Sequence, residues 1–227
     1  MTDLAPLQQA LNRTLPTARL QRYRLPGCNG LTLALINDDF DTGPLPQAVM
    51  NAVIAEPAYW AFCWGSGLAL AQELLADPDR VRGKRVLDFG AGSGVAGIAA
   101  AMAGARSVIA CDNDRDALLA CRSNASLNGV ALELCDSLEA LSTSVDCILL
   151  ADVLYDRSNL PLLRALKSLH QGAPSAPALI IADSRIADLS RWGFHCSGTR
   201  QALTLPNLGE FDEFATVRFF EAAPGQG

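Results

Sequence analysis

A short apolar segment, a run of glycines and a second apolar segment follow one another near the middle of the chain. Residues 85–89 read Arg-Val-Leu-Asp-Phe, residues 90–94 read Gly-Ala-Gly-Ser-Gly, and residues 95–103 are small and mostly apolar. This order predicts a strand, a tight turn and a closely packed helix, with the turn at the carboxyl end of the strand, where open α/β sheets bind ligands. Glycines let a backbone approach a ligand, and the free N–H groups of a helix N-terminus bind anionic groups. The segment therefore predicts a ligand site in an α/β fold.

Apolar strand-like segments and helical segments alternate along the chain. We expect further strands at residues 107–111, 131–135, 145–151, 178–182, 192–194 and 216–220, and helices at residues 68–76, 115–127 and 160–170. Most of these strands are apolar throughout, as burial on both faces requires. The alternation predicts a doubly wound, mostly parallel sheet with helices on both faces. The strand that contains Glu133 is the least apolar, and we expect it nearer an edge.

Length and the N-terminal sequence bound the domain organisation. A chain of 227 residues fits one domain with a short extension. Residues 1–50 show no clear periodicity and are predicted to be irregular, and a helix is expected at residues 46–56, stopped by Pro57. We therefore expect residues 1–56 to form an extension packed on a domain of residues 57–227.

Composition and charge argue against several classes of protein. The net charge of −6 lacks the basic footprint of a dedicated nucleic-acid binder. The N-terminus does not read as a secretory signal, and no apolar run approaches the ~20 residues of a membrane helix. The seven cysteines are scattered without a C-x-x-C pair, and neither His170 nor His195 has paired cysteines near it. We expect buried thiols in a reducing compartment, no bound metal and a location in the cytoplasm.

Two kinds of cofactor compete for the glycine run. Residues 92–97 match G-x-G-x-x-G, and Asp112 follows about twenty residues later, as in dinucleotide-binding folds. Asp88 argues against a dinucleotide, because a carboxylate facing the ligand would repel a pyrophosphate but would bind an ammonium group. Asp112 can accept hydrogen bonds from both ribose hydroxyls, and Asp136-Ser137 can meet an adenine amine. Three carboxylates at successive strand ends favour S-adenosylmethionine, and the alternatives are a dinucleotide or a turn without a ligand.

These motifs also resemble a known group of enzymes. The pattern D-x-G-x-G-x-G after a strand, with an acid closing the next strand, resembles the seven-strand methyltransferases. The Trp-rich stretch of residues 59–67 and the Asp-x-x-Tyr of residues 152–155 narrow the resemblance to the family-16 protein-lysine methyltransferases, over roughly residues 59–183. The resemblance implies a seven-stranded, Rossmann-like sheet and methyl transfer from S-adenosylmethionine to lysine side chains of a protein.

The resemblance and the strand-end positions together nominate site residues. Asp152 and Tyr155 are predicted to be catalytic. The predicted cofactor-binding residues lie at or beside the ends of the first four strands and in the segment before them; they are Trp64, Asp88, Gly90, Ala91, Gly92, Gly94, Asp112, Asn113, Asp136, Ser137 and Ala151. The sequence departs from the family at residues 182–185, Ala-Asp-Ser-Arg, which lack the proline and glycine expected there. The resemblance therefore does not extend to the family's substrate loop.

The acceptor chemistry sets what these residues must do. Lysine has a reference pKa near 10.4, so the site must bind the amine, let it lose a proton and aim its lone pair. Asp152 can attract and orient the ammonium, and Tyr155 can accept an amine N–H; the alternative interpretations are a helix cap and a core aromatic. Two other functions stay open: methylation of a different protein, such as a ribosomal protein, or of a small amine, and a non-catalytic binding module.

Overall fold

The computed structural model describes residues 2–141, 144–154, 157–170, 176–207, 209 and 212–222. The helices are α1 (Ala5–Thr14), α2 (Gln47–Ala55), α3 (Gly65–Ala76), α4 (Val95–Met102), α5 (Arg115–Leu127) and α6 (Leu162–Lys167). The strands are β1 (Leu20–Arg24), β2 (Thr32–Ile36), β3 (Arg85–Phe89), β4 (Ser107–Cys111), β5 (Glu133–Cys135), β6 (Cys147–Ala151), β7 (Ala178–Asp183), β8 (Phe194–Gln201) and β9 (Thr216–Ala222).

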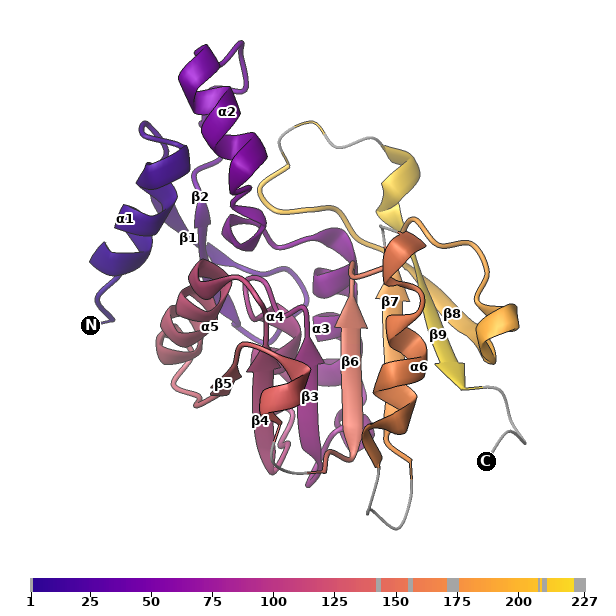
Figure 1. The fold of residues 1–227 in the computed structure, drawn as a ribbon. Helices are drawn as coiled ribbons and strands as arrows, with labels where there is room; N and C mark the ends of the chain where they lie inside the picture. The colour runs from indigo at the N-terminus through magenta and orange to yellow at the C-terminus, as the bar shows by residue number, and fades with distance from the viewer. Residues whose placement is uncertain are drawn as a thin grey trace.

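A seven-stranded sheet forms the centre of the molecule (Figure 1). Its strand order is β5-β4-β3-β6-β7-β9-β8; the first five strands are parallel, and β9 runs antiparallel to both of its neighbours. The predicted doubly wound, mostly parallel sheet is therefore confirmed. The strand with Glu133 lies at an edge, as its polar sequence indicated.

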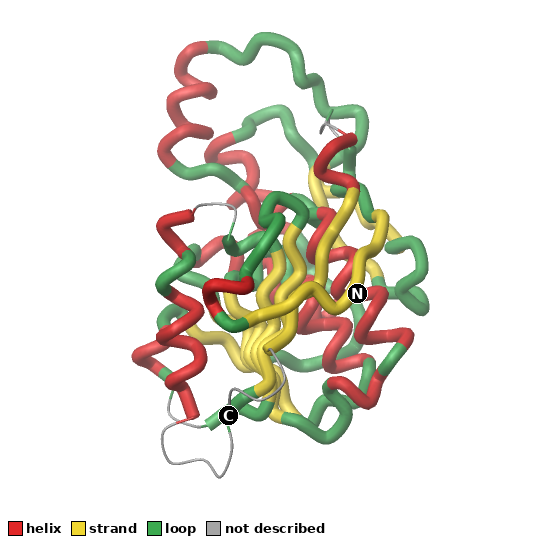
Figure 2. The backbone as a smooth tube through the Cα atoms, turned by 90° about the vertical axis from the view of Figure 1, so that its right-hand side faces the viewer, coloured by secondary structure: helices red, strands yellow, loops and turns green. Residues whose placement is uncertain are grey.

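Successive residues of the central strands face two separate cores. Val86 and Leu149 join the core under α3 and α4, whereas Leu87 and Leu150 join the core under α6. Figure 2 shows the strands as one layer with helices on either side. Burial on both faces explains why these strands read as continuous apolar runs. The helix expected at residues 160–170 is shorter than predicted, because the last residues form a separate 3-10 turn at Ser168–His170.

The N-terminal segment is more regular than its sequence indicated. The prediction that residues 1–50 are irregular is wrong: they contain α1 and an antiparallel hairpin of β1 and β2. The hairpin is anchored on α5, where the Asn124 side chain accepts from the Ala34 N–H at 2.8 Å and Asn128 pairs with both backbone groups of Thr32. The sequence Leu-Gln-Arg-Tyr-Arg of β1 leaves three residues exposed, so this strand lacks the apolar signal of the central ones.

Both lysines of the chain lie at the amino-terminal edge of the main sheet. Lys84 immediately precedes β3, and its Nζ donates to the Arg80 carbonyl at 2.6 Å. Lys167 ends α6, where Nζ donates to the Trp192 carbonyl at 2.9 Å and lies 4.2 Å from the centre of the Phe194 ring. The ligand site predicted from the glycine run lies at the opposite edge.

The described residues show neither a membrane span nor a metal cluster. None of the described helices has the length and apolar character needed to cross a bilayer. Within the same residues, no three His, Cys, Asp or Glu side chains gather in a way that could hold a metal ion.

Candidate active site

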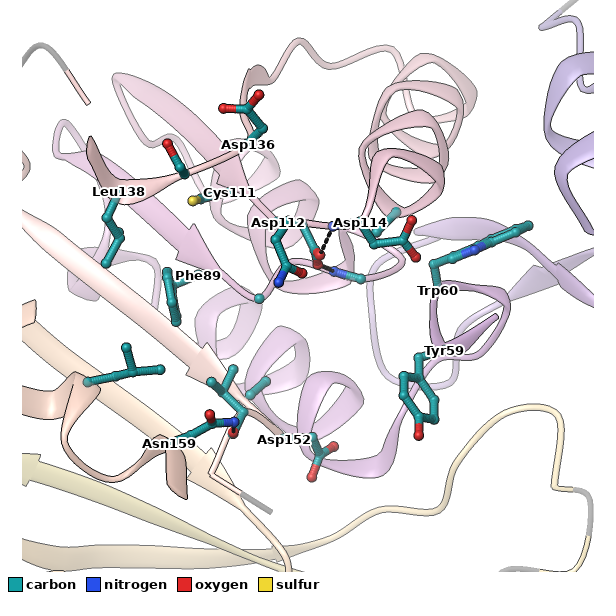
Figure 3. Close-up of a pocket in the computed structure, with 18 of the residues that line it drawn as sticks. Tyr59, Trp60, Phe89, Cys111, Asp112, Asp114, Asp136, Leu138, Asp152 and Asn159 are labelled. Atoms are coloured by element: carbon teal, nitrogen blue, oxygen red, sulfur yellow. Dashed lines mark hydrogen bonds between the residues drawn. The ribbon is translucent and has the colours of Figure 1, made fainter. Parts of the chain in front are cut away.

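A cavity of about 630 Å³ opens at the carboxyl edge of the sheet (Figure 3). Such a volume is in the range of small-molecule and cofactor sites. Its described lining comes from the ends of β3, β4, β5 and β6 and the residues after them, from the segment before α3, from the first turns of α5 and α6, and from the turn after β7; the residues are Tyr59, Trp60, Trp64, Phe89, Gly90, Gly92, Cys111, Asp112, Asn113, Asp114, Ala117, Asp136, Ser137, Leu138, Glu139, Ala151, Asp152, Val153, Asn159, Leu162 and Arg185.

The glycine run forms the floor between β3 and α4. Gly92 has a φ of +52°, and a Cβ added there would meet nothing within 4 Å, so this backbone faces open space in the cavity. The turn is held by α5, because the Asn124 side chain donates to the Ser93 carbonyl at 2.9 Å. The loop therefore offers exposed backbone at a fixed position.

Asp112 closes β4 beside this loop. One carboxylate oxygen accepts from the Gly92 N–H at 2.9 Å and the other from the Asp114 N–H at 3.0 Å. Burial raises the pKa of this carboxyl, and the two backbone hydrogen bonds act against that rise. Each oxygen keeps lone-pair capacity for a donor in the cavity, such as a ribose hydroxyl.

Three residues predicted to bind the cofactor do not line the cavity. Asp88 is only 2% exposed; its carboxylate lies behind the glycine run and accepts from the Gly97 N–H at 2.8 Å. Burial raises the pKa of Asp88 to about 7. Ala91 packs against Ala110 and Cys121, and a Cβ on Gly94 would lie 3.1 Å from the Cys121 Cα. These three residues shape the loop from behind, so the expected direct contact of Asp88 with an ammonium group is not what this geometry supports.

Asp152 lies at the end of β6 with a φ of +53°, a backbone conformation that residues other than glycine rarely adopt. Its carboxylate accepts from the Ser66 hydroxyl at 2.5 Å and from the Ser66 backbone N–H at 3.1 Å. Burial raises the pKa of Asp152 to about 7, opposed by the hydroxyl of Ser66 and assisted by the nearby charge of Asp183. Strained backbone and a perturbed carboxyl at the wall of a cavity are typical of functional sites.

A second buried carboxyl, Asp183, ends the neighbouring strand β7. One oxygen accepts from the backbone N–H groups of Arg185 and Ile186 at 2.8 and 2.9 Å. Its other oxygen has no hydrogen-bond partner in the described structure. Burial raises the pKa of Asp183 as well. The ends of β6 and β7 thus hold two adjacent carboxyls, of which Asp152 lines the cavity wall.

Aromatic side chains of the segment that leads into α3 form another part of the cavity wall. Figure 3 shows Tyr59 and Trp60 on the segment that leads into α3. The Trp64 indole N–H donates to the Tyr59 carbonyl at 2.9 Å, and the two rings meet edge to face at a centroid distance of 5.9 Å. These contacts give the wall a fixed shape.

Most of the predicted site residues come together here. Nine of them line the cavity: Trp64, Gly90, Gly92, Asp112, Asn113, Asp136, Ser137, Ala151 and Asp152. Tyr155 lies outside the described residues. The prediction missed Asn159, whose side chain donates to the Val153 carbonyl at 2.9 Å, and the apolar side chains of Leu138 and Leu162. A strand-end pattern does not reach these positions, because they lie in turns and helices beyond the strands.

The charged residues of the lining indicate which kind of ligand the cavity can bind. Its acidic residues are Asp112, Asp114, Asp136, Glu139 and Asp152, and Arg185 is the one basic residue in the described lining. The Arg185 guanidinium lies 4.3 Å from the centre of the Phe214 ring. This mostly acidic lining suits a nucleoside that carries a positive charge and lacks phosphate, and it disfavours a diphosphate.

The fold is that of the Rossmann-like, S-adenosylmethionine-dependent methyltransferases. A 16S rRNA N2 G1207 methyltransferase from T. thermophilus, solved in complex with AdoMet and guanosine, superposes with a TM-score of 0.54 at 15% identity, covering 91% of this chain and 50% of the other. At that identity the likeness shows the fold alone.

Sequence comparison adds named relatives and confirms the resemblance found in the motifs. Residues 69–161 match the family described as ribosomal protein L11 methyltransferase (PrmA). The electron transfer flavoprotein beta subunit lysine methyltransferase of Rattus norvegicus is 43% identical over 101 residues, which are 43% of this chain and 40% of that protein. The ribosomal protein L11 methyltransferase of Geobacter sulfurreducens is 44% identical over 86 residues, covering 38% of this chain and 27% of that protein. The matched segment thus spans well under half of these relatives.

Proposed function

We propose that this chain transfers a methyl group from S-adenosylmethionine to lysine side-chain amines of a protein. The observation that carries the proposal is the position of Asp152: a buried carboxyl at the end of β6, on the wall of the cavity whose floor is the glycine run. The named lysine methyltransferases among the relatives support the same acceptor.

The cofactor side of the proposal rests on the ends of β3, β4 and β5. Bound S-adenosylmethionine supplies an electrophilic methyl group on a sulfonium. Asp112 accepts from the ribose hydroxyls, Asp136 and Ser137 meet the adenine, and the backbone of Gly90 and Gly92 lies along the ligand. Trp64 and Ala151 close the cavity, and Asn113 extends its wall beside Asp112. Asp88 holds the glycine run in shape from behind, through Gly97.

On the acceptor side, Asp152 binds the incoming ammonium and receives its proton. A carboxyl with an ordinary pKa would hold the lysine in its charged form and accept a proton poorly. With its pKa raised to about 7, Asp152 is better matched to that transfer near neutral pH. Ser66 fixes the direction of the carboxylate through two hydrogen bonds. From its position in the sequence motif, Tyr155 is proposed as a second partner of the amine.

The electron transfer flavoprotein β subunit is the first candidate substrate, because relatives of that name share about 40% identity over 101 residues. Ribosomal protein L11 is the second candidate, and the family match over residues 69–161 favours it. We place the protein in the cytoplasm, because its seven cysteines are all free thiols. Residues 1–56 are proposed to be an extension packed on the catalytic domain of residues 57–227.

Transfer of a labelled methyl group tests the proposal directly. The purified chain is incubated with tritiated S-adenosylmethionine and, in separate reactions, with electron transfer flavoprotein, ribosomal protein L11 and a cell extract. Label on a lysine of a protein, located by peptide mass spectrometry, is the expected result. Label only in small soluble products would assign a small-amine acceptor, and calorimetric binding of the cofactor with no label anywhere would assign a non-catalytic module.

A further inference from the structure

Four large apolar side chains are exposed in the described structure. They are Ile54 (75% exposed), Tyr59 (52%), Met50 (42%) and Leu203 (41%). Two belong to α2, a helix with no fully buried residue, and Tyr59 follows it directly in the chain. Figure 1 shows α2 above the carboxyl ends of the strands, and Val49 and Val53 on its other face pack against the N-terminal core. Apolar groups gathered at one end of a molecule mark an interaction site more often than scattered ones do.

Backbone pairing ties Leu203 to the same place. Cys63 and Leu205 exchange two hydrogen bonds, Cys63 N–H to Leu205 O at 2.8 Å and Leu205 N–H to Cys63 O at 2.9 Å. A Cβ on Gly65 would lie 2.9 Å from the Ala202 carbonyl, so the two backbones touch there. The segment around Leu203 therefore lies alongside residues 63–65, which follow Tyr59 at the start of α3, although the two segments are about 140 residues apart in sequence.

This surface continues into the cavity. Tyr59 both is exposed and lines the cavity, and its neighbours Trp60 and Trp64 line the cavity wall. Figure 3 shows Tyr59 and Asp152 on the same side of the cavity. A chain that lies on α2 can therefore extend past Tyr59 and direct one side chain toward Asp152.

The charge of this region selects the partner. Residues 40–66, which include α2 and Tyr59, contain no lysine or arginine and carry Asp41 and Glu56. The described cavity lining is acidic too, apart from Arg185. An apolar surface within an acidic region attracts basic segments and disfavours acidic ones.

We propose that Met50, Ile54, Tyr59 and Leu203 form the docking surface for the substrate protein, and that they bind an apolar segment of it that lies outside the few residues around the lysine to be methylated. This inference rests on the proposed function and names the surface that selects its protein substrate. Contacts made there act on binding of the whole protein and not on the transfer step. The expected signature is a change in KM without a change in kcat.

The test uses the full chain, the protein that accepts label from the wild type, and a short synthetic peptide of about seven residues around the modified lysine. The double variant Met50→Ser/Ile54→Ser removes two exposed apolar side chains, and Gln47→Ser on the same helix is the matched control. For the double variant we expect KM for the whole protein to rise about tenfold or more, with kcat within about twofold and an unchanged calorimetric Kd for S-adenosylmethionine. The short peptide does not reach α2 and should be methylated equally by all three forms.

Each other outcome contradicts a defined part of the argument. An unchanged KM in the double variant, with a wild type that labels protein, overturns the docking surface and leaves the proposed function standing. A wild type that labels no protein overturns both. A wild type that is dimeric in light scattering, with a monomeric double variant of unchanged KM, assigns the surface to a second copy of this chain.

Discussion

The two sides of the cavity are built from contacts of different range. On the cofactor side, Asp112 is held by backbone N–H groups 2 and 20 residues away, in the unit formed by β3, α4 and β4 and the turn after it. On the acceptor side, Asp152 is held by Ser66, 86 residues earlier in the chain, and lies beside Asp183 from the next strand of the sheet. The cofactor side is thus a local construction, whereas the acceptor side exists only when α3, β6 and β7 have assembled.

This difference predicts that substitutions on the two sides of the cavity have different effects. A carboxylate satisfied by backbone N–H groups loses its partners only if the loop itself changes shape. Asp152 depends on the hydroxyl and backbone N–H of one distant residue, Ser66, and on a strained backbone, and it lies buried beside a second carboxyl. We expect substitutions on the cofactor side to change binding of S-adenosylmethionine, and substitutions on the acceptor side to change turnover and its pH dependence.

The largest effect is expected from Gly92→Arg. The added side chain would enter the open space above the loop, and residue 92 would have to keep a φ of +52°. Binding of S-adenosylmethionine should fall below detection by calorimetry, a loss of about a thousandfold or more. Gly129→Arg is the control, because Gly129 also has a positive φ and open space but lies after α5, outside the described cavity lining. Equal binding by the wild type and Gly92→Arg would remove the loop from the cofactor site.

Asp152→Asn should leave cofactor binding nearly unchanged and reduce kcat by about 100-fold or more, as loss of a proton-transfer group does. The comparison is measured by steady-state methyl transfer together with calorimetric Kd. Asp146→Asn, at the amino end of the same strand and outside the described cavity lining, should keep full turnover. Normal kcat in Asp152→Asn would contradict the acceptor-side assignment.

Asp112→Ala should weaken binding of S-adenosylmethionine by about 1–3 kcal/mol, the cost of leaving buried donors without a partner. The substitution also frees the Gly92 and Asp114 N–H groups. Isothermal calorimetry measures the change, and Asp116→Ala, whose carboxylate pairs with exposed Arg13, should bind the cofactor like the wild type. A change in kcat at saturating cofactor would contradict the assignment of Asp112 to cofactor binding alone.

Ser66→Ala should give the smallest effect and the sharpest test of the acceptor side. The folded pKa of Asp152 lies at about 7, above its ordinary value of 3.8, so turnover should rise as the pH rises through about 7 and the carboxylate ionises. The Ser66 hydroxyl lowers that pKa, and removing it should move the rise in kcat to higher pH. Ser190→Ala breaks a similar serine–aspartate pair on the surface and should leave the pH profile unchanged. A profile that does not move would show that Ser66 has no influence on the titrating group.

The same division explains what the sequence could predict. Residues 85–94 predicted a strand and its ligand loop, because the apolar run and the glycines are consecutive in the sequence. Asp112 and Asp136 were predicted to be site residues because they directly follow apolar strands. The pairing of Ser66 with Asp152 left no local signal, since it depends on how α3 packs against β6. Asp88 shows a different limit of the sequence. The motif gives its position at the end of β3, but it does not give the direction of its side chain, which lies behind the glycine run and accepts from the Gly97 N–H. The hairpin of residues 20–36 was missed for a related reason, because side-chain amides of α5 anchor it.

The positions of the two lysines have a practical consequence for any enzyme that modifies lysine. Lys84 and Lys167 lie at the far edge of the sheet from the cavity, and the Nζ of each donates to a backbone carbonyl. Within one molecule, neither amine can reach Asp152 without unfolding the strands between them. A molecule of the catalyst should therefore not methylate its own lysines, which lowers the background against which a single methyl group on a foreign protein can be counted.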